Sequence, residues 1–319
     1  MPRVLLTGGA GFIGSAVART LLASGREVVV LDLLTYAGNR DNLDGLNIEF
    51  VQGDVCDEAL VRSLVQGVDA VVHAAAESHV ARSLTDPAPF LRPNIEGTRV
   101  VLEAAADARV PHTVHVSTDE VFGQAEHHEI FAPTDTLRPG NVYAASKAAA
   151  EAFVHAVAHT RGYRATVVRC TNNYGPRQHS EKAIPGWIRR ALAGGPLPIH
   201  GRGEAIRDWL HVEDFAAGLL AVLERGTPGD VHHFSGRTPK TNREVAERIL
   251  GLCGGGPLDF QEDRPGQDKR YALDDRRTRR VLEWAPKLSF DEGLTRLVER
   301  HRELLCAPTR WPAATLAGG

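Results

Sequence analysis

Residues 3–14 read RVLLTGGAGFIG, a short apolar run followed at once by a glycine-rich turn. The turn contains the spacing Gly9-x-Gly11-x-x-Gly14, with Gly8 just before it, and a helical pattern begins as the turn ends. Glycines in this position let backbone N–H groups approach a pyrophosphate at the positive end of the following helix. The stretch therefore predicts a dinucleotide-binding unit, in preference to a glycine turn that merely packs tightly.

A second apolar run, residues 26–32, ends in Asp32. An acidic residue at this point can accept hydrogen bonds from both ribose hydroxyls of NAD. A 2′-phosphate in the same place would lie ~4 Å from the carboxylate, which costs on the order of 4 kcal/mol per charge pair at a surface-like dielectric. Arg40 could compensate that charge, but it lies several residues into the following loop. The cofactor predicted from these residues is therefore NAD.

Strand-like and helix-like stretches alternate through the first two-thirds of the chain. Further apolar runs cover residues 47–54, 69–75, 112–117 and 164–170, and helical patterns cover residues 12–24, 94–108 and 141–158. Buried β-branched runs that alternate with helices indicate right-handed βαβ units and a parallel sheet covered on both faces. The predicted fold class is α/β, a Rossmann-like doubly wound parallel sheet, with residues 1–171 as an NAD-binding domain.

The pattern changes after Thr171. Pro and Gly become frequent, and helical patterns at residues 212–224 and 241–250 are separated by loops. We expect residues 172–319 to form a smaller, mixed α/β substrate domain that closes over the carboxyl edge of the sheet. Residues 206–236 are expected to return to the larger domain.

Composition argues against several other classes of protein. The 319 residues are 43% hydrophobic and 24% charged, and the net charge of −3 gives no field suited to nucleic acid or an anionic membrane. No apolar run approaches the ~20 residues that cross a bilayer, and the N-terminus has no cleavable apolar region. The four cysteines form no CxxC pair, which indicates reduced thiols and a cytoplasmic setting. The histidines in AEHHEI (125–130) and VHHF (231–234) lack a convincing ligand set, so no metal is expected.

Residues 141–158, NVYAASKAAAEAFVHAVA, form an alanine-rich helical pattern that carries Tyr143 and Lys147 four positions apart. Residues with this spacing lie on the same face of a helix. A lysine ammonium and a positive nicotinamide ring would lower the tyrosine pKa from about 10, so that the phenolate could act as a base. An ordinary surface Tyr–Lys pair is the alternative. The dinucleotide turn upstream and the strand that ends in Ser117 and Thr118 favour a catalytic pair.

Residues 116–123, VSTDEVFG, place two adjacent carboxylates directly after a buried strand. Close carboxyl groups push their pKa values apart, which can supply an acid and a base in one pocket. In a regular strand Thr118 and Glu120 would face one way and Asp119 the other. For all three to serve one pocket the pleat must end near Ser117, and the glycine that follows lets the chain turn away. The alternative interpretation is an acidic loop at a strand end.

Beyond these residues, the chain resembles the extended short-chain dehydrogenase/reductases that act on nucleotide sugars and, within them, the dTDP-glucose 4,6-dehydratases. The resemblance covers nearly the whole chain, and the Thr-Asp-Glu segment is its most specific part. The stretches that carry it are LTYAGNRDNL (34–43), HAAAESHVARS (73–83), STDEVFG (117–123), NNYGPRQ (172–178), EKAIP (181–185), IRDWLHVED (206–214) and DRPGQDKRYA (263–272).

The resemblance implies an NAD-dependent hydro-lyase of deoxysugar biosynthesis that converts dTDP-glucose to dTDP-4-keto-6-deoxyglucose. Such an enzyme oxidises C4, removes water across C5 and C6, and returns the hydride to C6. The 4-ketone makes the C5 hydrogen acidic, so a base must take that proton while an acid protonates the departing C6 hydroxyl. By the family pattern Asp119 is the acid and Glu120 is the base. Thr118 hydrogen-bonds the C4 oxygen beside Tyr143, and Lys147 completes the catalytic set.

The resemblance also implies two sets of binding residues. The cofactor set is Gly8, Gly11, Phe12, Ile13, Gly14, Asp32, Leu33, Thr35, Asp54, Val55, Ala74, Ala75, Ala76, Ser117, Tyr143, Lys147 and Asn173. The substrate set is Ser78, Thr118, Asn172, Glu181, Lys182, Pro198, Ile199, His200, Arg207, Asn242, Arg264 and Gln267. Arg207 can fork onto phosphate oxygens, and Asn172 and Asn242 can donate amide hydrogens. The basic stretch at residues 268–280 is expected to form a solvated face.

Four positions depart from the family pattern, and none of them removes a catalytic group. Ala81 stands in place of an aspartate, Pro93 of a threonine, Phe122 of a tyrosine and Gln267 of a histidine. The resemblance further implies a homodimer that forms through the helices at residues 94–108 and 141–158.

Two other functions stay open at this point. A nucleotide-sugar 4-epimerase or decarboxylase of the same superfamily needs Tyr143 and Lys147 but has no use for an acid–base pair beside Thr118. A non-catalytic NAD-binding regulator would be free to lose either residue of the Tyr–Lys pair.

Overall fold

The central feature of the fold is a sheet of seven strands, described from a computed structural model that covers residues 1–263 and 268–306. All neighbouring strands in this sheet run parallel. Their order is β10 (Val231–Phe234), β6 (Thr166–Cys170), β5 (His112–Thr118), β4 (Ala70–His73), β1 (Arg3–Thr7), β2 (Glu27–Asp32) and β3 (Glu49–Gln52). The chain winds outward from β1 on one side and from β4 on the other, which is the doubly wound Rossmann arrangement. The predicted fold class is confirmed.

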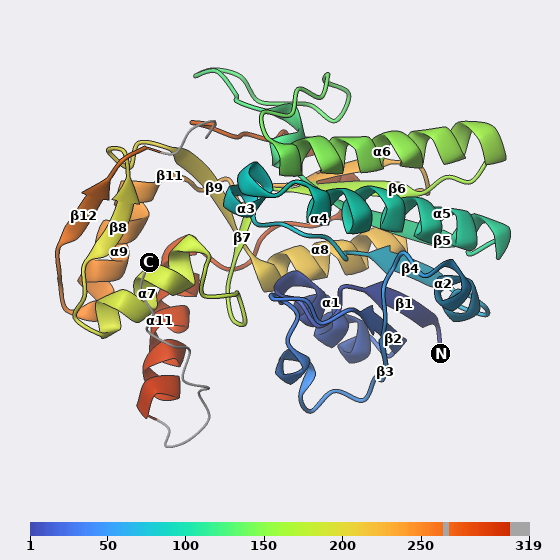
Figure 1. Cartoon of the computed structure of the whole chain (residues 1–319), viewed down its shortest axis with the longest axis horizontal. Coiled ribbons are helices and arrows are strands. Elements are labelled where there is room, and N and C mark those ends of the chain that lie inside the picture. The colour runs from blue at the N-terminus through green and yellow to red at the C-terminus, as the bar shows by residue number, and fades with distance from the viewer. Residues whose placement is uncertain (264–267, 307–319) are drawn as a thin grey trace.

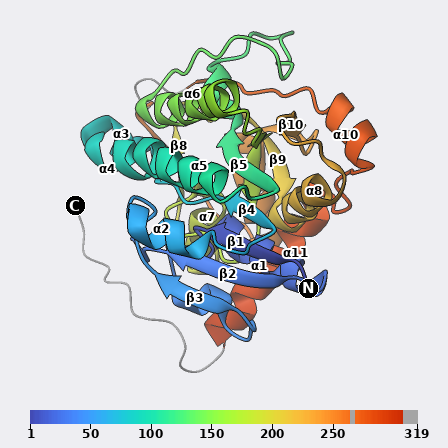
Figure 2. The same ribbon diagram turned by 90° about the vertical axis from the view of Figure 1, so that its right-hand side faces the viewer.

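Helices cover both faces of this sheet (Figure 1). They are α2 (Glu58–Leu64), α5 (Thr98–Asp107) and α6 (Val142–Arg161) on one face, and α1 (Phe12–Ala23) and α8 (Val212–Arg225) on the other. Val4 and Leu6 pack into the core with Phe215 of α8, whereas Leu5 packs with Val101 of α5. Because both faces are buried, the strands read as continuous apolar runs. Figure 2 shows α5 and α6 side by side from a second direction.

A smaller group of elements lies beyond the carboxyl ends of the parallel strands (Figure 1). It contains two small sheets, β7 (Asn172–Tyr174) with β9 (Ile206–His211) and β11 (Pro239–Thr241), and β8 (Leu197–His200) with β12 (Leu258–Gln261). Its longer helices are α7 (Ala183–Leu192), α9 (Asn242–Cys253) and α11 (Phe290–Cys306). Trp187, Ile199, Val245 and Leu294 lie in its separate apolar core.

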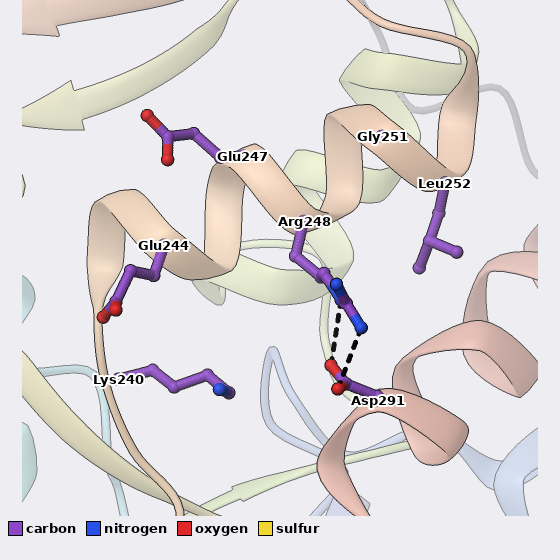
Figure 3. Close-up of a pocket in the computed structure, with 7 residues that line it drawn as sticks. All are labelled: Lys240, Glu244, Glu247, Arg248, Gly251, Leu252 and Asp291. Carbon is purple, nitrogen blue, oxygen red and sulfur yellow. Dashed lines mark hydrogen bonds and ion pairs between the residues drawn. The ribbon is translucent and has the colours of Figure 1, made fainter.

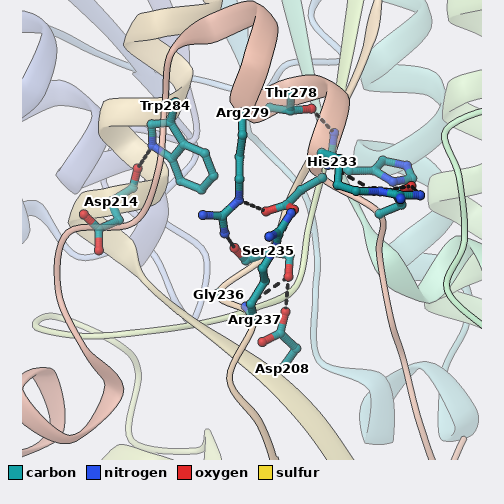
Figure 4. Close-up of polar contacts among 12 residues, drawn as sticks. Asp208, Asp214, His233, Ser235, Gly236, Arg237, Thr278, Arg279 and Trp284 are labelled. Carbon is teal, nitrogen blue, oxygen red and sulfur yellow. Dashed lines mark hydrogen bonds and ion pairs between the residues drawn. The ribbon is translucent and has the colours of Figure 1, made fainter.

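Polar contacts fasten the last helices to the rest of the molecule. Arg248 of α9 makes a two-point contact with Asp291 of α11, at 2.9 and 2.8 Å (Figure 3). The segment around α10 (Arg276–Leu282) is held to the loop after β10, where Arg279 donates to the carbonyl of Ser235 at 3.1 Å (Figure 4). Trp284 donates to the carbonyl of Asp214 in α8 at 3.0 Å, so the C-terminal segment contacts both groups of elements.

The predicted elements are present, with shifted ends and one change of type. The helix expected at residues 94–108 starts as a π-helix, Arg92–Gly97, before α5 begins. Pro93 lies in that first turn and has no N–H to donate. The remaining short helices are α3 (Val80–Thr85), α4 (Ala88–Leu91) and two 3-10 helices, Arg40–Leu43 and Asp119–Phe122.

Residues 206–236 divide between the two groups of elements, because β10 joins the large sheet whereas β9 pairs with β7 and β11. The division into domains at residues 171 and 172 remains a prediction. Within the described ranges, no helix is both long enough and apolar enough to span a membrane.

Candidate active site

The glycine turn between β1 and α1 packs closely against neighbouring backbone, so a side chain would not fit at Gly8 or Gly14. Gly8 has a φ of +71°, and a Cβ there would collide with the backbone of Ala75. A Cβ at Gly14 would collide with the carbonyl oxygen of Gly8. Gly8, Gly11, Phe12, Ile13 and Gly14 all line one cavity of about 250 Å³. Because no side chains cover this turn, its backbone N–H groups can approach a bound pyrophosphate.

Asp32 lies at the end of β2, where its carboxylate is held by the backbone. Its Oδ2 accepts a hydrogen bond from the N–H of Ala10 at 2.9 Å, and its Oδ1 accepts one from Leu34 at 2.8 Å. Burial raises the pKa of Asp32, and these two hydrogen bonds act in the opposite direction. Asp32 is only 8% exposed and does not itself line the cavity, so its role toward the ribose stays a prediction.

Several predicted cofactor residues lie outside this cavity. The side chain of Leu33 is 49% exposed and that of Val55 is buried, while Asp54 pairs with Arg92 at 3.0 Å. Thr35 lies in the loop after β2, and Ala75 packs against the core around α2 and α5. The cavity instead gathers the second half of the set, which is Ala74, Ala76, Ser117, Tyr143, Lys147 and Asn173.

The strand that precedes the two carboxylates ends close to where the sequence predicts. β5 runs to Thr118, a 3-10 helix begins at Asp119, and Gly123 at φ +70° turns the chain away. Because the pleat stops here, Thr118, Asp119 and Glu120 all line the same cavity as Tyr143 and Lys147. The structure thus brings the whole predicted catalytic set together.

Asp119 and Glu120 have different surroundings. Burial and the neighbouring Glu120 hold the pKa of Asp119 well above its usual range. Its Oδ1 accepts from the Thr118 hydroxyl at 3.2 Å, and its buried Oδ2 has no hydrogen-bond partner in the part of the chain that is described. Burial also raises the pKa of Glu120, but its Oε2 accepts from the Asn141 amide at 3.1 Å and the Tyr271 hydroxyl at 3.4 Å. These donors favour the ionised form of Glu120 over that of Asp119.

Burial shifts the pKa values of Tyr143 and Lys147 in opposite directions. Burial raises the pKa of Tyr143 well above its usual range, and the Glu120 carboxylate adds to this. Burial lowers the pKa of Lys147 to about 8, and its Nζ lies 3.4 Å from Nε2 of His115. The lowered phenol pKa predicted from the sequence depends on a bound nicotinamide ring as well as on Lys147, so it stays a prediction for the chain with its cofactor.

A second cavity of about 470 Å³ adjoins the first and shares five of its lining residues, Ser78, Glu120, Asn172, Glu181 and Lys182. Pro198, His200, Arg207 and Asn242 of the predicted substrate set also line it. The guanidinium of Arg207 stacks over the Tyr271 ring, 4.5 Å from its centroid, and donates to the carbonyls of Ile206 and Asp268.

Ile199 of the predicted substrate set lines neither cavity. Ile199 alternates with Pro198 and His200 along β8, so its side chain enters the core of the smaller group. Arg264 and Gln267 fall outside the described residues, as does the side chain of Ala81. Phe122 is buried and stacks on Phe131 with ring centroids 4.7 Å apart.

Sequence reasoning missed several residues that line the second cavity, among them Asn141, Asp268 and Tyr271. The expected solvated face at residues 268–280 is wrong at Tyr271, which is only 5% exposed and donates to Asp268 at 2.9 Å. A tyrosine within a charged run was the available signal. For Asn141 the signal was its place directly before an alanine-rich helix.

No second candidate site is found in the described residues, either among possible metal ligands or in the surface depression drawn in Figure 3. Across residues 1–263 and 268–306, no group of three or more His, Cys, Asp or Glu side chains could hold a metal ion. The depression has a volume of about 490 Å³ and lies on α9 and α11, where Arg248 and Asp291 are already paired. None of the predicted site residues lines it.

A buried ion pair between Arg169 and Glu151 contacts the end of β5. Arg169 of β6 contacts Glu151 of α6 at 2.6 Å, with side chains 3% and 0% exposed. Glu151 also accepts from the hydroxyl of Ser117 at 2.5 Å, and Arg169 stacks on Phe122. The pair therefore joins β6, β5 and the helix that carries Tyr143 and Lys147.

Replacing Glu151 by Gln is expected to lower the free energy of unfolding by about 3–5 kcal/mol, because Arg169 then keeps a buried, unpaired charge. Urea titration of both chains measures the loss. The matched control is Glu49→Gln, which breaks an ion pair with Arg3 whose side chains are 55% and 39% exposed. That change should cost at most about 1 kcal/mol. Equal losses in the two variants would contradict the assignment.

The chain is similar to known proteins over most of its length. The model of the NAD dependent epimerase/dehydratase family matches residues 4–234. The low-salt glycan biosynthesis protein Agl12 of Haloferax volcanii is 45% identical over 93% of this chain and 97% of its own length. The dTDP-glucose 4,6-dehydratase of Streptomyces niveus is 44% identical over 94% of this chain and 93% of its own.

Two solved structures are similar over almost the whole fold. DesIV, a dTDP-glucose 4,6-dehydratase from Streptomyces venezuelae with NAD and TYD bound, gives a TM-score of 0.92 at 43% identity, covering 94% of this chain and 97% of that chain. UDP-glucose 4-epimerase from Thermotoga maritima gives 0.90 at 30% identity, covering 95% of this chain and 99% of that chain.

Proposed function

The chain belongs to the NAD dependent epimerase/dehydratase family, and we propose that within it the chain is a nucleotide-sugar 4,6-dehydratase that converts dTDP-glucose with NAD. The observation that carries this proposal is the shared cavity of Asp119, Glu120, Tyr143 and Lys147. An enzyme that only oxidises and reduces C4 has no use for the two carboxyl groups.

The residues present fit NAD. The turn at Gly8 and Gly14 has no room for side chains, and the Asp32 carboxylate is held beside it by the N–H of Ala10. These residues would hold the pyrophosphate and the ribose, with Ser117 and Asn173 further along the same cavity. When bound, NAD supplies the acceptor for the hydrogen of C4 and the donor that returns it to C6.

The chain's own residues move the protons. Thr118 and Tyr143 bind the C4 oxygen, and Tyr143 takes its proton. Glu120 then takes the C5 proton, which the ketone at C4 has made acidic. Asp119, whose pKa burial raises, donates its proton to the departing C6 hydroxyl, which leaves as water. When C6 receives the hydride, Glu120 returns its proton to C5. The different surroundings of the two carboxyl groups thus match an acid and a base.

Positive and amide groups favour a diphosphate in the second cavity. Arg207 and Lys182 both line it, and Arg207 is held by its stacking on Tyr271. Asn172 and Asn242 add amide donors. A planar, pre-oriented guanidinium suits phosphate oxygens better than a mobile side chain would.

The function is tested by incubating the chain with NAD and dTDP-glucose and recording the product by mass spectrometry and NMR. Loss of one water with a ketone at C4 is the expected result. An unchanged mass with inverted C4 would overturn the proposal in favour of an epimerase. No turnover of any nucleotide sugar would favour a regulator that binds NAD.

Binding should distinguish NAD from NADP through Asp32. We expect NADP to bind at least about 100-fold more weakly than NAD, because a 2′-phosphate would face the carboxylate. Calorimetric titration with both nucleotides measures the ratio. Asp32→Asn should bring the ratio to within about tenfold, whereas the exposed control Glu27→Gln should leave it unchanged. Equal binding of NAD and NADP by the unaltered chain would contradict this role.

We further propose a cytoplasmic homodimer. Cys56, Cys170, Cys253 and Cys306 are free thiols, in keeping with a reducing compartment. α5 and α6 lie side by side and are rich in alanine, so that their outer faces could pack closely against a second copy. Analytical ultracentrifugation that finds a monomer would contradict the dimer.

A further inference from the structure

Asn141 lies between Glu120 and the helix that carries Tyr143 and Lys147. Its Nδ2 is 3.1 Å from Oε2 of Glu120, and its Oδ1 accepts from the backbone N–H of Ala144 at 2.9 Å. Asn141 is thus the N-cap of α6, and its side chain also lines the substrate cavity.

The orientation of the Asn141 amide is fixed by its neighbours. The N–H of Ala144 can only donate, so the amide oxygen must face the helix. The amide nitrogen therefore faces Glu120, and a donor there favours an ionised carboxylate as its acceptor. One planar group thus connects the start of α6 to Glu120.

Glu120 has an uneven set of contacts. Oε2 accepts from Asn141 and from Tyr271, whereas Oε1 accepts no hydrogen bond from any residue in the described ranges. The carboxylate lines both cavities, so the unengaged oxygen is available to a substrate. The ionisable groups around it are Asp119, Tyr143, Lys182, Arg207, Asp268 and Tyr271.

We propose that Asn141 is a positioning residue that ties the Glu120 carboxylate to the N-terminus of α6 and keeps it ionised as the base of the elimination step. This inference rests on the proposed function. Tyr143 and Lys147 lie in the first turns of α6, and Asn141 begins the same helix. The contact from Asn141 therefore fixes the position of Glu120 relative to Tyr143 and Lys147.

Two substitutions separate the role of Asn141 as the N-cap of α6 from its role as a hydrogen-bond donor to Glu120. Serine and aspartate are both strong N-cap residues, so Asn141→Ser and Asn141→Asp should keep α6 intact. Serine is too short to reach Glu120, and aspartate places an acceptor where the donor was. The control is Asp57→Ser, which exchanges the cap of α2 away from both cavities.

The direct measurement is a pH titration of isotope-labelled glutamate carboxyl carbons by NMR, without substrate. The Glu120 signal is identified by its loss in Glu120→Gln. Removing a donor destabilises the carboxylate, so the midpoint should rise by about one pH unit in Asn141→Ser and about two in Asn141→Asp. An unchanged midpoint in both variants would overturn the proposal, whether or not the chain turns over dTDP-glucose.

Kinetics give a second readout. At neutral pH, Asn141→Ser should slow loss of water about tenfold and Asn141→Asp about 100-fold, with C4 oxidation within about twofold of the unaltered chain. The acid limb of the elimination profile should move to higher pH, since the base stays protonated longer. Equal slowing of oxidation and elimination would indicate a merely structural role. Absence of turnover in the unaltered chain would instead refute the proposed function and leave the NMR result to decide on Asn141.

Discussion

Glu120→Gln should oxidise C4 of dTDP-glucose at close to the normal rate and then lose water about 10³-fold more slowly. General bases contribute about 10²–10⁴-fold to proton transfer, and glutamine cannot take the C5 proton. The amide oxygen can still accept from Asn141 and Tyr271, so the local geometry should persist. Rapid-quench analysis separates the two steps, because the 4-keto sugar should accumulate before any water is lost.

The control for this variant is Glu126→Gln, a carboxylate exposed on the loop after the 3-10 helix. It should eliminate water at the normal rate. If Glu120→Gln also did so, Glu120 would have no part in the mechanism, and another group would have to take the C5 proton.

Tyr143→Phe is expected to slow C4 oxidation by about 10³–10⁴-fold. The aromatic ring would still fill its place in the cavity, but nothing would take the proton of the C4 hydroxyl. Because dehydration needs the 4-ketone first, elimination should fall by the same factor. Single-turnover absorbance of the nicotinamide measures the oxidation step directly.

A matched control exists at the far end of the same helix region. Tyr163 follows α6 and bonds Thr113 through its hydroxyl at 2.5 Å, outside both cavities. Tyr163→Phe should therefore oxidise C4 normally. A Tyr143→Phe chain that oxidised within about tenfold of normal would transfer the role of base to another residue.

Much of this arrangement could be predicted because it depends on local patterns. The glycine turn, the apolar runs and the alanine-rich helix each have a signature in a few neighbouring residues. The position of Asp119 and Glu120 in one cavity followed from strand geometry, since three consecutive side chains can meet only where the pleat ends.

Other parts depended on contacts between distant segments. Tyr271 contacts Glu120 across 151 positions of the chain, and it directly follows the charged residues Lys269 and Arg270 in sequence. Burial raises the pKa of Tyr143 in the chain without its cofactor, and burial is a property of the assembled fold. Ile199 was expected to bind substrate, but side chains alternate between the two faces of β8, and that of Ile199 points into the apolar core of the smaller group.

The central claim is that Tyr143 and the two carboxyl groups reach consecutive carbons of one sugar. A crystal structure of the Asp119→Asn, Glu120→Gln chain with NAD and dTDP-glucose tests it most directly. We predict the C4 hydroxyl within hydrogen-bond distance of Tyr143 and Thr118, with C5 facing residue 120 and the C6 hydroxyl facing residue 119. A sugar bound with C5 and C6 turned away from both residues would contradict the claim.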